Sequence, residues 1–122
     1  MRHFTELNAW KNGIQLAKEV HHLTKLLPSD ERFGMIQQLR KCSGSILANI
    51  AEGFGRFTYP DKAAKYTISR GECSETEAHL HVAVAFEYLK QEQIEKALKL
   101  VTIEGKLLSG LISACRQRES ES

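Results

Sequence analysis

Apolar residues recur every three or four positions along most of the chain, and this spacing predicts long amphipathic helices without competing strands. The first stripe runs from Leu7 to Leu27 and stops at Pro28. Ser29 suits the N-cap of a second helix, because acidic residues follow it in the first turn, where the helix dipole favours negative charge. This second helix is expected to end near Gly53.

Two further helical stripes follow in the second half of the chain. Thr58 is a suitable N-cap for a third helix that reaches about Leu89, and a short polar turn then leads to a stripe from Ile94 to Cys115. Because short connections place successive helices antiparallel, the sequence predicts an all-α fold, an up-down-up-down four-helix bundle. We expect residues 1–118 to form this single domain.

Size and composition agree with one globular domain. A chain of 122 residues buries roughly two-thirds of the surface that it exposes when unfolded. With 42% hydrophobic and 26% charged residues, it falls among ordinary soluble proteins. No segment approaches the roughly 20 apolar residues of a membrane span, and the polar N-terminus does not resemble a signal peptide. We therefore expect a cytoplasmic protein with no membrane contact, and a disordered polar tail at residues 119–122.

Glycines punctuate the second helix and the segment that follows it. In the stretch NIAEGFGR, at residues 49–56, Gly53 stands where a helix commonly ends in a left-handed residue. A phosphate-binding loop places its glycines before a helix and not after one, so this stretch predicts a helix end. Gly44 and Gly71 lie inside helices, where glycine is unfavourable, and they predict tight helix crossings.

Polar side chains near this stretch have both a structural and a chemical interpretation. Asn49 and Glu52 share a face on the last turns of the second helix, and Glu75 lies on the third. We interpret Asn49, Glu52 and Glu75 as a structural polar cluster that fixes helix register. Glu75 with His79 would suit a metal in a bundle core, but the Glu-x-x-His pairs of di-iron bundles are absent, so no metal or cofactor is expected.

The cysteines point away from disulfides and metal binding. Cys42, Cys73 and Cys115 are odd in number and widely spaced, and they lie among apolar or small residues at helical intervals. We expect buried, reduced thiols.

Charge is distributed unevenly along the chain, although the net charge is only +2. Residues 40–70 carry a local net charge of +4, whereas residues 71–95 carry −5. A segregated charge of this kind favours assembly or an anionic partner. The candidate nucleic-acid-binding residues are Arg40, Lys41, Arg56, Lys62, Lys65 and Arg70.

The aromatic residues between the second and third helices leave two interpretations open. Phe54, Phe57 and Tyr59 are interspersed with basic residues, a composition that can stack on bases and contact phosphates. Loop aromatics also pack over the end of a bundle or fill an oligomer interface. The two uses can coexist.

Three segments together resemble a known bacterial family. These are FTELNAWKNGIQLAKEV at residues 4–20, LPSDERFGMIQQLRKCSGSILANIAEGFGR at 27–56, and RGECSETEAHL at 70–80. The chain resembles the four-helix bundle proteins encoded by intervening sequences of 23S ribosomal RNA genes, which are related to the accessory variability proteins of diversity-generating retroelements. Where that family commonly reads Gly-Ser-Leu-x-Glu, this chain has Glu72 and Cys73 in place of the serine and leucine.

The resemblance implies a closed ring of five bundles, nucleic acid as a ligand and a reverse transcriptase as a protein partner. Our leading hypothesis is a non-enzymatic homo-oligomeric bundle that binds RNA or DNA through its basic residues, with no small-molecule substrate. The alternative is a protein–protein adaptor for an acidic partner such as a reverse transcriptase, with no direct role for nucleic acid. A metal-dependent enzyme is the third and least favoured hypothesis.

Overall fold

The computed structural model describes residues 1–121, which form four long helices and two short 3₁₀ turns without any strand. The all-helical class and the number of long helices are therefore as predicted. No helix in this part of the chain combines the length and the apolar character needed to cross a membrane. The elements are η1 (Phe4–Glu6), α1 (Asn8–Thr24), η2 (Ser29–Glu31), α2 (Met35–Phe54), α3 (Tyr59–Ala85) and α4 (Gln91–Glu121).

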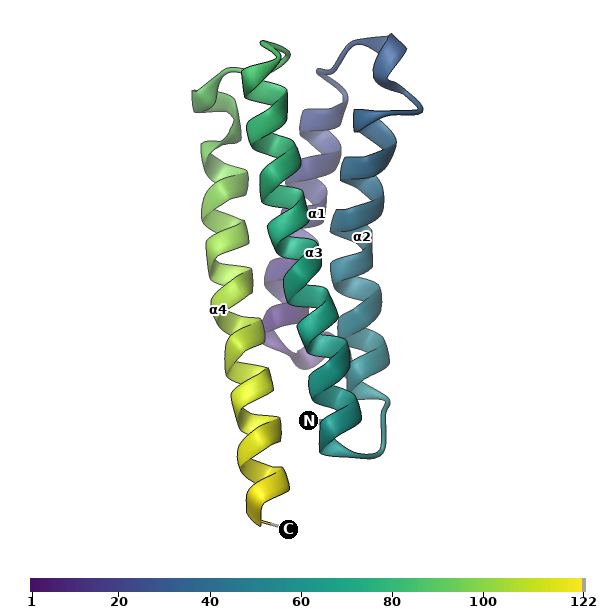
Figure 1. Cartoon of the computed structure of the whole chain (residues 1–122), viewed down its shortest axis with the longest axis vertical. Helices are drawn as coiled ribbons and strands as arrows, with labels where there is room; N and C mark the ends of the chain where they lie inside the picture. Colours follow the sequence, from purple (N-terminus) through teal and green to yellow (C-terminus); the bar gives the residue numbers. More distant parts are fainter. Residues whose placement is uncertain (122) are drawn as a thin grey trace.

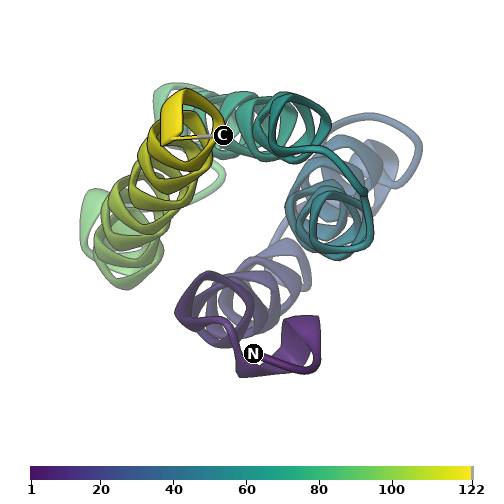
Figure 2. The same ribbon diagram turned by 90° about the horizontal axis from the view of Figure 1, so that it is seen from below.

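The four long helices lie alongside one another and surround a common core (Figures 1 and 2). α1 packs against α2 and α4, and α3 packs against the same two helices from the other side. The α1–α2 and α3–α4 connections lie at one end of the molecule, and the α2–α3 connection lies at the other (Figure 1). Aliphatic side chains from all four helices fill the centre, including the fully buried Leu16, Leu39, Ile46, Leu80, Ile94 and Leu108.

The start of α2 differs from the sequence prediction and the start of α3 agrees with it, whereas α3 ends at Ala85 and not near Leu89 as predicted. Ser29 is not the N-cap of α2, because residues 29–31 form the separate turn η2 and α2 begins at Met35. The carboxylate of Glu31 accepts a hydrogen bond from the Met35 amide at 3.2 Å and satisfies one of the free donors at this helix start. At α3, Thr58 is the predicted N-cap, and its hydroxyl accepts a hydrogen bond from the Asp61 amide at 3.2 Å.

α4 continues beyond the predicted stripe to Glu121. It thus includes residues 119–121 of the segment expected to be a polar tail, and these residues are helical and exposed. Ser122, the last residue of that segment, lies outside the described residues.

Gly53 has a different role from the predicted one. It lies inside α2 with negative φ, and the helix ends one residue later, at Phe54. A Cβ atom at Gly53 would lie 2.7 Å from Cε1 of the buried Tyr66 ring, so the glycine allows α3 to approach α2. Gly44 and Gly71, which were predicted to mark tight crossings, have no atom within 4 Å of such a Cβ. Neither glycine therefore marks a tight crossing within this chain, because both lie on exposed helix faces.

Two substitutions in α2 separate these roles. Gly53→Ala should lower the free energy of unfolding by about 1–3 kcal/mol, because the buried Tyr66 ring has to move. Gly44→Ala is the matched control, and it should raise stability by up to about 1 kcal/mol through helix propensity alone. Urea denaturation followed by circular dichroism measures both. Equal effects of the two substitutions would contradict the packing role of Gly53.

Candidate nucleic-acid interface

The six basic residues predicted to bind nucleic acid do not converge on one surface. Arg40, on α2, extends toward α1, and its Nε donates a hydrogen bond to Thr24 Oγ1 at 2.9 Å. Arg70, on α3, extends toward α4, and its Nη1 donates to Ser109 Oγ at 3.3 Å. Because α2 and α3 pack side by side, these two guanidinium groups point to opposite flanks of the helix pair.

Two of the predicted lysines are engaged at the C-terminal end of α2. Lys62 Nζ donates a hydrogen bond to the Phe54 carbonyl at 2.6 Å, where a cation also interacts favourably with the helix dipole. Lys65 Nζ lies 2.8 Å from Glu52 Oε2, and its hydrogen bond and charge hold the pKa of that carboxyl below the usual value. Both side chains therefore tie α3 to the last turn of α2.

Arg56, in the connection between α2 and α3, also lies beside acidic side chains. Arg56 lines a hollow of about 470 Å³ together with Glu52, Phe57 and Asp61. The two carboxylates offset the charge that this loop would offer to a phosphate. Of the loop aromatics, Phe54 and Tyr59 pack against the core, whereas the Phe57 ring is fully exposed.

Asn49, Glu52 and Glu75 each have a different partner. Asn49 Nδ2 donates to the Ser45 carbonyl at 2.9 Å and lies 3.1 Å from Ser45 Oγ, so its hydrogen bonds stay within α2. Glu52 forms the α2–α3 ion pair described above. Glu75 Oε1 lies 3.5 Å from His79 Nε2, one turn further along α3. The polar contacts are thus spread along two helices.

Potential metal ligands do not gather in the part of the chain that the structure describes. Within residues 1–121, no group of three His, Cys, Asp or Glu side chains is arranged to hold a metal ion. The three cysteines are buried and free of disulfides, as the sequence predicted. Burial raises the pKa of Cys73 to about 12, which keeps this thiol protonated and unreactive at neutral pH.

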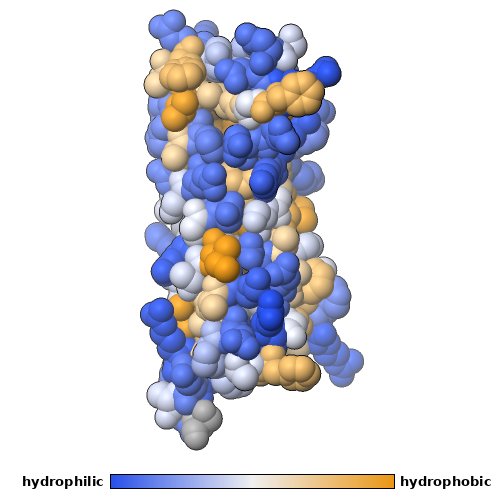
Figure 3. All heavy atoms as spheres, turned by 45° about the vertical axis from the view of Figure 1, so that its right-hand side comes forward, coloured by the Kyte–Doolittle hydropathy of each residue, from blue (hydrophilic) through white to orange (hydrophobic). Residues whose placement is uncertain are grey.

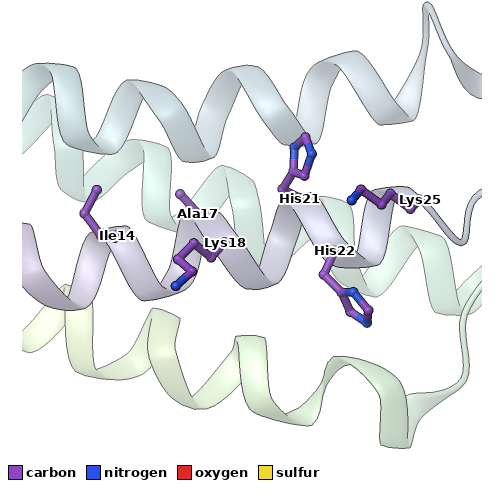
Figure 4. Close-up of a pocket in the computed structure, with 6 residues that line it drawn as sticks. All are labelled: Ile14, Ala17, Lys18, His21, His22 and Lys25. Carbon is purple, nitrogen blue, oxygen red and sulfur yellow. The ribbon is translucent and has the colours of Figure 1, made fainter.

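A more coherent basic surface lies on α1 and the first half of α2. One hollow of about 410 Å³ follows α1, and Figure 4 shows the side chains that line it. A second hollow of about 520 Å³ lies at the start of α2. Neither hollow is lined by a carboxylate, although Lys41 also lines an adjacent hollow together with Glu72 and Glu75. The first is lined by Ile14, Ala17, Lys18, His21, His22 and Lys25, and the second by Arg32, Phe33, Ile36, Gln37, Arg40 and Lys41.

Hydrogen bonds link the two hollows. Arg40 lines the second hollow and donates to Thr24 Oγ1, and the same hydroxyl donates to the His21 carbonyl at 2.7 Å beside the first. We call the combined surface the α1–α2 basic face and define it by its cationic and imidazole side chains. These are Lys18, His21, His22, Lys25, Arg32, Arg40 and Lys41.

Sequence reasoning found only Arg40 and Lys41 of this face. It missed the members on α1, although positions 18, 21, 22 and 25 recur at the three- and four-residue spacing of one helix face. That spacing is the signal that could have found them. The other missed member, Arg32, belongs to the connection before α2, a segment that the sequence had assigned to the helix itself.

Exposed apolar groups are scattered over the surface. On the face that Figure 3 shows, the hydrophobic side chains form separate groups among largely hydrophilic residues and do not merge into one broad patch. The most exposed large apolar side chains are Phe57, at 101% relative exposure, and Phe33, at 84%. They follow Arg56 and Arg32 directly, so each exposed ring stands beside a guanidinium group in the sequence.

The core contains one carboxyl group that the sequence analysis missed. Glu104 of α4 is completely buried, and Asn12 Nδ2 donates to its Oε1 at 2.9 Å and to the Leu100 carbonyl at 3.0 Å. Its Oε2 has no hydrogen-bond partner among the described residues and occupies space left by Gly13, where a Cβ would lie 2.9 Å away. Burial raises the pKa of Glu104 to about 7, while the Asn12 hydrogen bond partly opposes the shift.

Glu104 makes stability depend on pH. Below pH 4.5 its carboxyl is protonated in both the folded and the unfolded chain; between 4.5 and about 7 only the unfolded chain releases the proton. The free energy of unfolding should therefore fall as pH rises through this window, by about 3 kcal/mol in total. In urea titrations from pH 4.5 to 8, wild type should lose this amount relative to Glu104→Gln. A constant difference between the two proteins would contradict a titrating buried carboxyl.

Comparison with known proteins agrees with the helical architecture. A family model described as 23S rRNA-intervening sequence protein matches residues 5–110. The chain is also similar to the crystal structure of a protein of unknown function from the S23 ribosomal protein family of Bacteroides thetaiotaomicron, with 30% sequence identity and a TM-score of 0.78. That similarity covers 85% of this chain and 97% of the other. No curated protein matches the chain.

Proposed function

Since the chain belongs to the 23S rRNA-intervening sequence protein family, we propose that it is a non-enzymatic helical bundle that binds RNA or DNA through a basic surface. The observation that carries the proposal is the α1–α2 basic face, whose two hollows are lined by cationic and imidazole side chains without a carboxylate. This surface replaces the dispersed set that includes Arg56, Lys62, Lys65 and Arg70 as the site of contact.

The chemistry of this face suits a phosphate backbone. Its lysine and arginine side chains come from two neighbouring helices and the connection between them, so they offer several positive charges in two hollows on this side of the bundle. Such contacts release counterions from the nucleic acid and make affinity strongly dependent on salt. Phosphate contacts position a nucleic acid without reading its bases, so we expect weak sequence specificity.

We further propose that the bundle has up-down-up-down topology and forms a ring-shaped homo-oligomer. The connections at alternating ends of the molecule support the topology (Figure 1). The opposite net charges of residues 40–70 and 71–95 support contacts between copies, and the resemblance to the family implies five subunits. A ring would repeat the α1–α2 basic face in every subunit and strengthen binding through multivalency.

Neutralising exposed lysines of the α1–α2 basic face should weaken binding. The test protein combines Lys18→Ala, Lys25→Ala and Lys41→Ala, and fluorescence anisotropy measures its affinity for RNA and DNA single strands at several salt concentrations. The slope of log affinity against log salt is negative for such binding, and loss of three phosphate contacts should reduce its magnitude by about 2. The affinity of wild type should fall steeply as salt rises.

The matched control removes the same charge from exposed positions of α4, with Lys96→Ala, Lys99→Ala and Lys106→Ala. This control should retain most of the affinity. If the two triple variants lose affinity equally, the loss comes from the change in overall charge. That result would overturn the assignment of the binding site to α1 and α2. A folded wild type that binds no nucleic acid at low salt would favour the alternative function, an adaptor for an acidic protein such as a reverse transcriptase.

A further inference from the structure

The connection between α1 and α2 presents an aromatic ring at the edge of the α1–α2 basic face. Phe33 is 84% exposed and follows Arg32 directly in the chain. Its side chain lines the same hollow as Arg40 and Lys41, and Ile36 adds an apolar wall. An exposed phenyl ring is thus placed among three cationic side chains, in a hollow that no carboxylate lines.

Specific contacts fix the backbone that carries this ring. Glu31 Oε1 accepts the amide hydrogen of Met35 at 3.2 Å, and its Oε2 accepts the Tyr88 hydroxyl at 2.9 Å. One carboxylate therefore joins the start of α2 to the connection that follows α3. A Cβ at Gly34 would lie 2.7 Å from Glu31 Oε1, so the glycine beside Phe33 makes room for this contact. The exposed Phe33 ring is therefore carried by a turn whose backbone is held in place by Glu31.

We propose that Phe33 is a stacking platform for an unpaired base and that the α1–α2 basic face binds single-stranded rather than double-stranded nucleic acid. The inference rests on the proposed function and specifies its ligand. Bases in a duplex are already stacked and paired, whereas an unpaired base can lay its face on an aromatic side chain. Arg40 and Lys41, which line the same hollow, then contact phosphates of the same strand.

The other exposed phenyl ring shows why position matters. Phe57 also follows an arginine and is even more exposed, but the hollow beside it is lined by Glu52 and Asp61. Glu52 is already paired with Lys65, and the Asp61 carboxylate repels the phosphates that would flank a stacked base. Phe57 therefore lacks the charge environment that Phe33 has and serves as a matched control.

The experiment compares Phe33→Ala with Phe57→Ala. Anisotropy titrations use a fluorescent single-stranded RNA and a duplex RNA of equal length. Phe33→Ala should bind the single strand about 10-fold more weakly, because the stacking contact is lost, and should leave duplex affinity unchanged. Phe57→Ala should match wild type with both ligands. Phe33→Trp should restore single-strand affinity, whereas Phe33→Leu, which keeps apolar bulk without a ring, should not.

Light scattering of each variant separates stacking from subunit contact. A change in solution mass on Phe33→Ala would identify the ring as an interface residue and overturn the inference. Equal losses for Phe33→Ala and Phe57→Ala, or equal losses with single strand and duplex, would also overturn it. In those cases, salt-dependent binding that the α1–α2 lysines control would still support the proposed function. Wild type that binds neither RNA would contradict both.

Discussion

The approach of α1 to both neighbouring helices is tightest at one buried glycine, which limits how the helix can be rotated. Gly13 has no side chain, and a Cβ there would lie 2.9 Å from Glu104 of α4 and 2.9 Å from Leu47 of α2. Asn12, the preceding residue, donates a hydrogen bond to the same glutamate. A buried carboxyl is costly unless it is hydrogen-bonded, so this contact favours one register of α1 over its alternatives.

That register decides which polar side chains of α1 and α2 adjoin. With Gly13 turned to the core, Lys18 and Lys25 lie on the outer side of α1, and the Arg40–Thr24 hydrogen bond joins α2 to the same flank. A rotation of α1 about its own axis would move Lys18 and Lys25 away from Arg40 of α2. It would also turn polar side chains into the core. The buried Glu104–Asn12 contact therefore helps to position the α1–α2 basic face, although Glu104 itself does not belong to that face.

The candidate site was only partly predictable, because long basic side chains take partners that sequence does not reveal. Arg40 and Lys41, both named from the sequence as candidate binding residues, line one hollow, whereas the basic residues of α1 were not named. Lys62 and Lys65 look equally available in the sequence. In the folded chain, a helix-terminal carbonyl and the Glu52 carboxylate engage them, since both partners lie within reach across the α2–α3 turn.

The four helices, their apolar faces and the buried cysteines could be predicted from the order of the residues alone, because helical periodicity is a local property of the chain. The sequence did not determine which glycines allow close packing: Gly13 and Gly53 do, whereas Gly44 does not. Glu104 falls on the apolar spacing between Val101 and Leu108, but the sequence did not indicate that Asn12 would be its partner. These features, and the joining of α1 and α2 into one basic face, were decided only by the tertiary structure, because they depend on contacts between residues far apart in the chain.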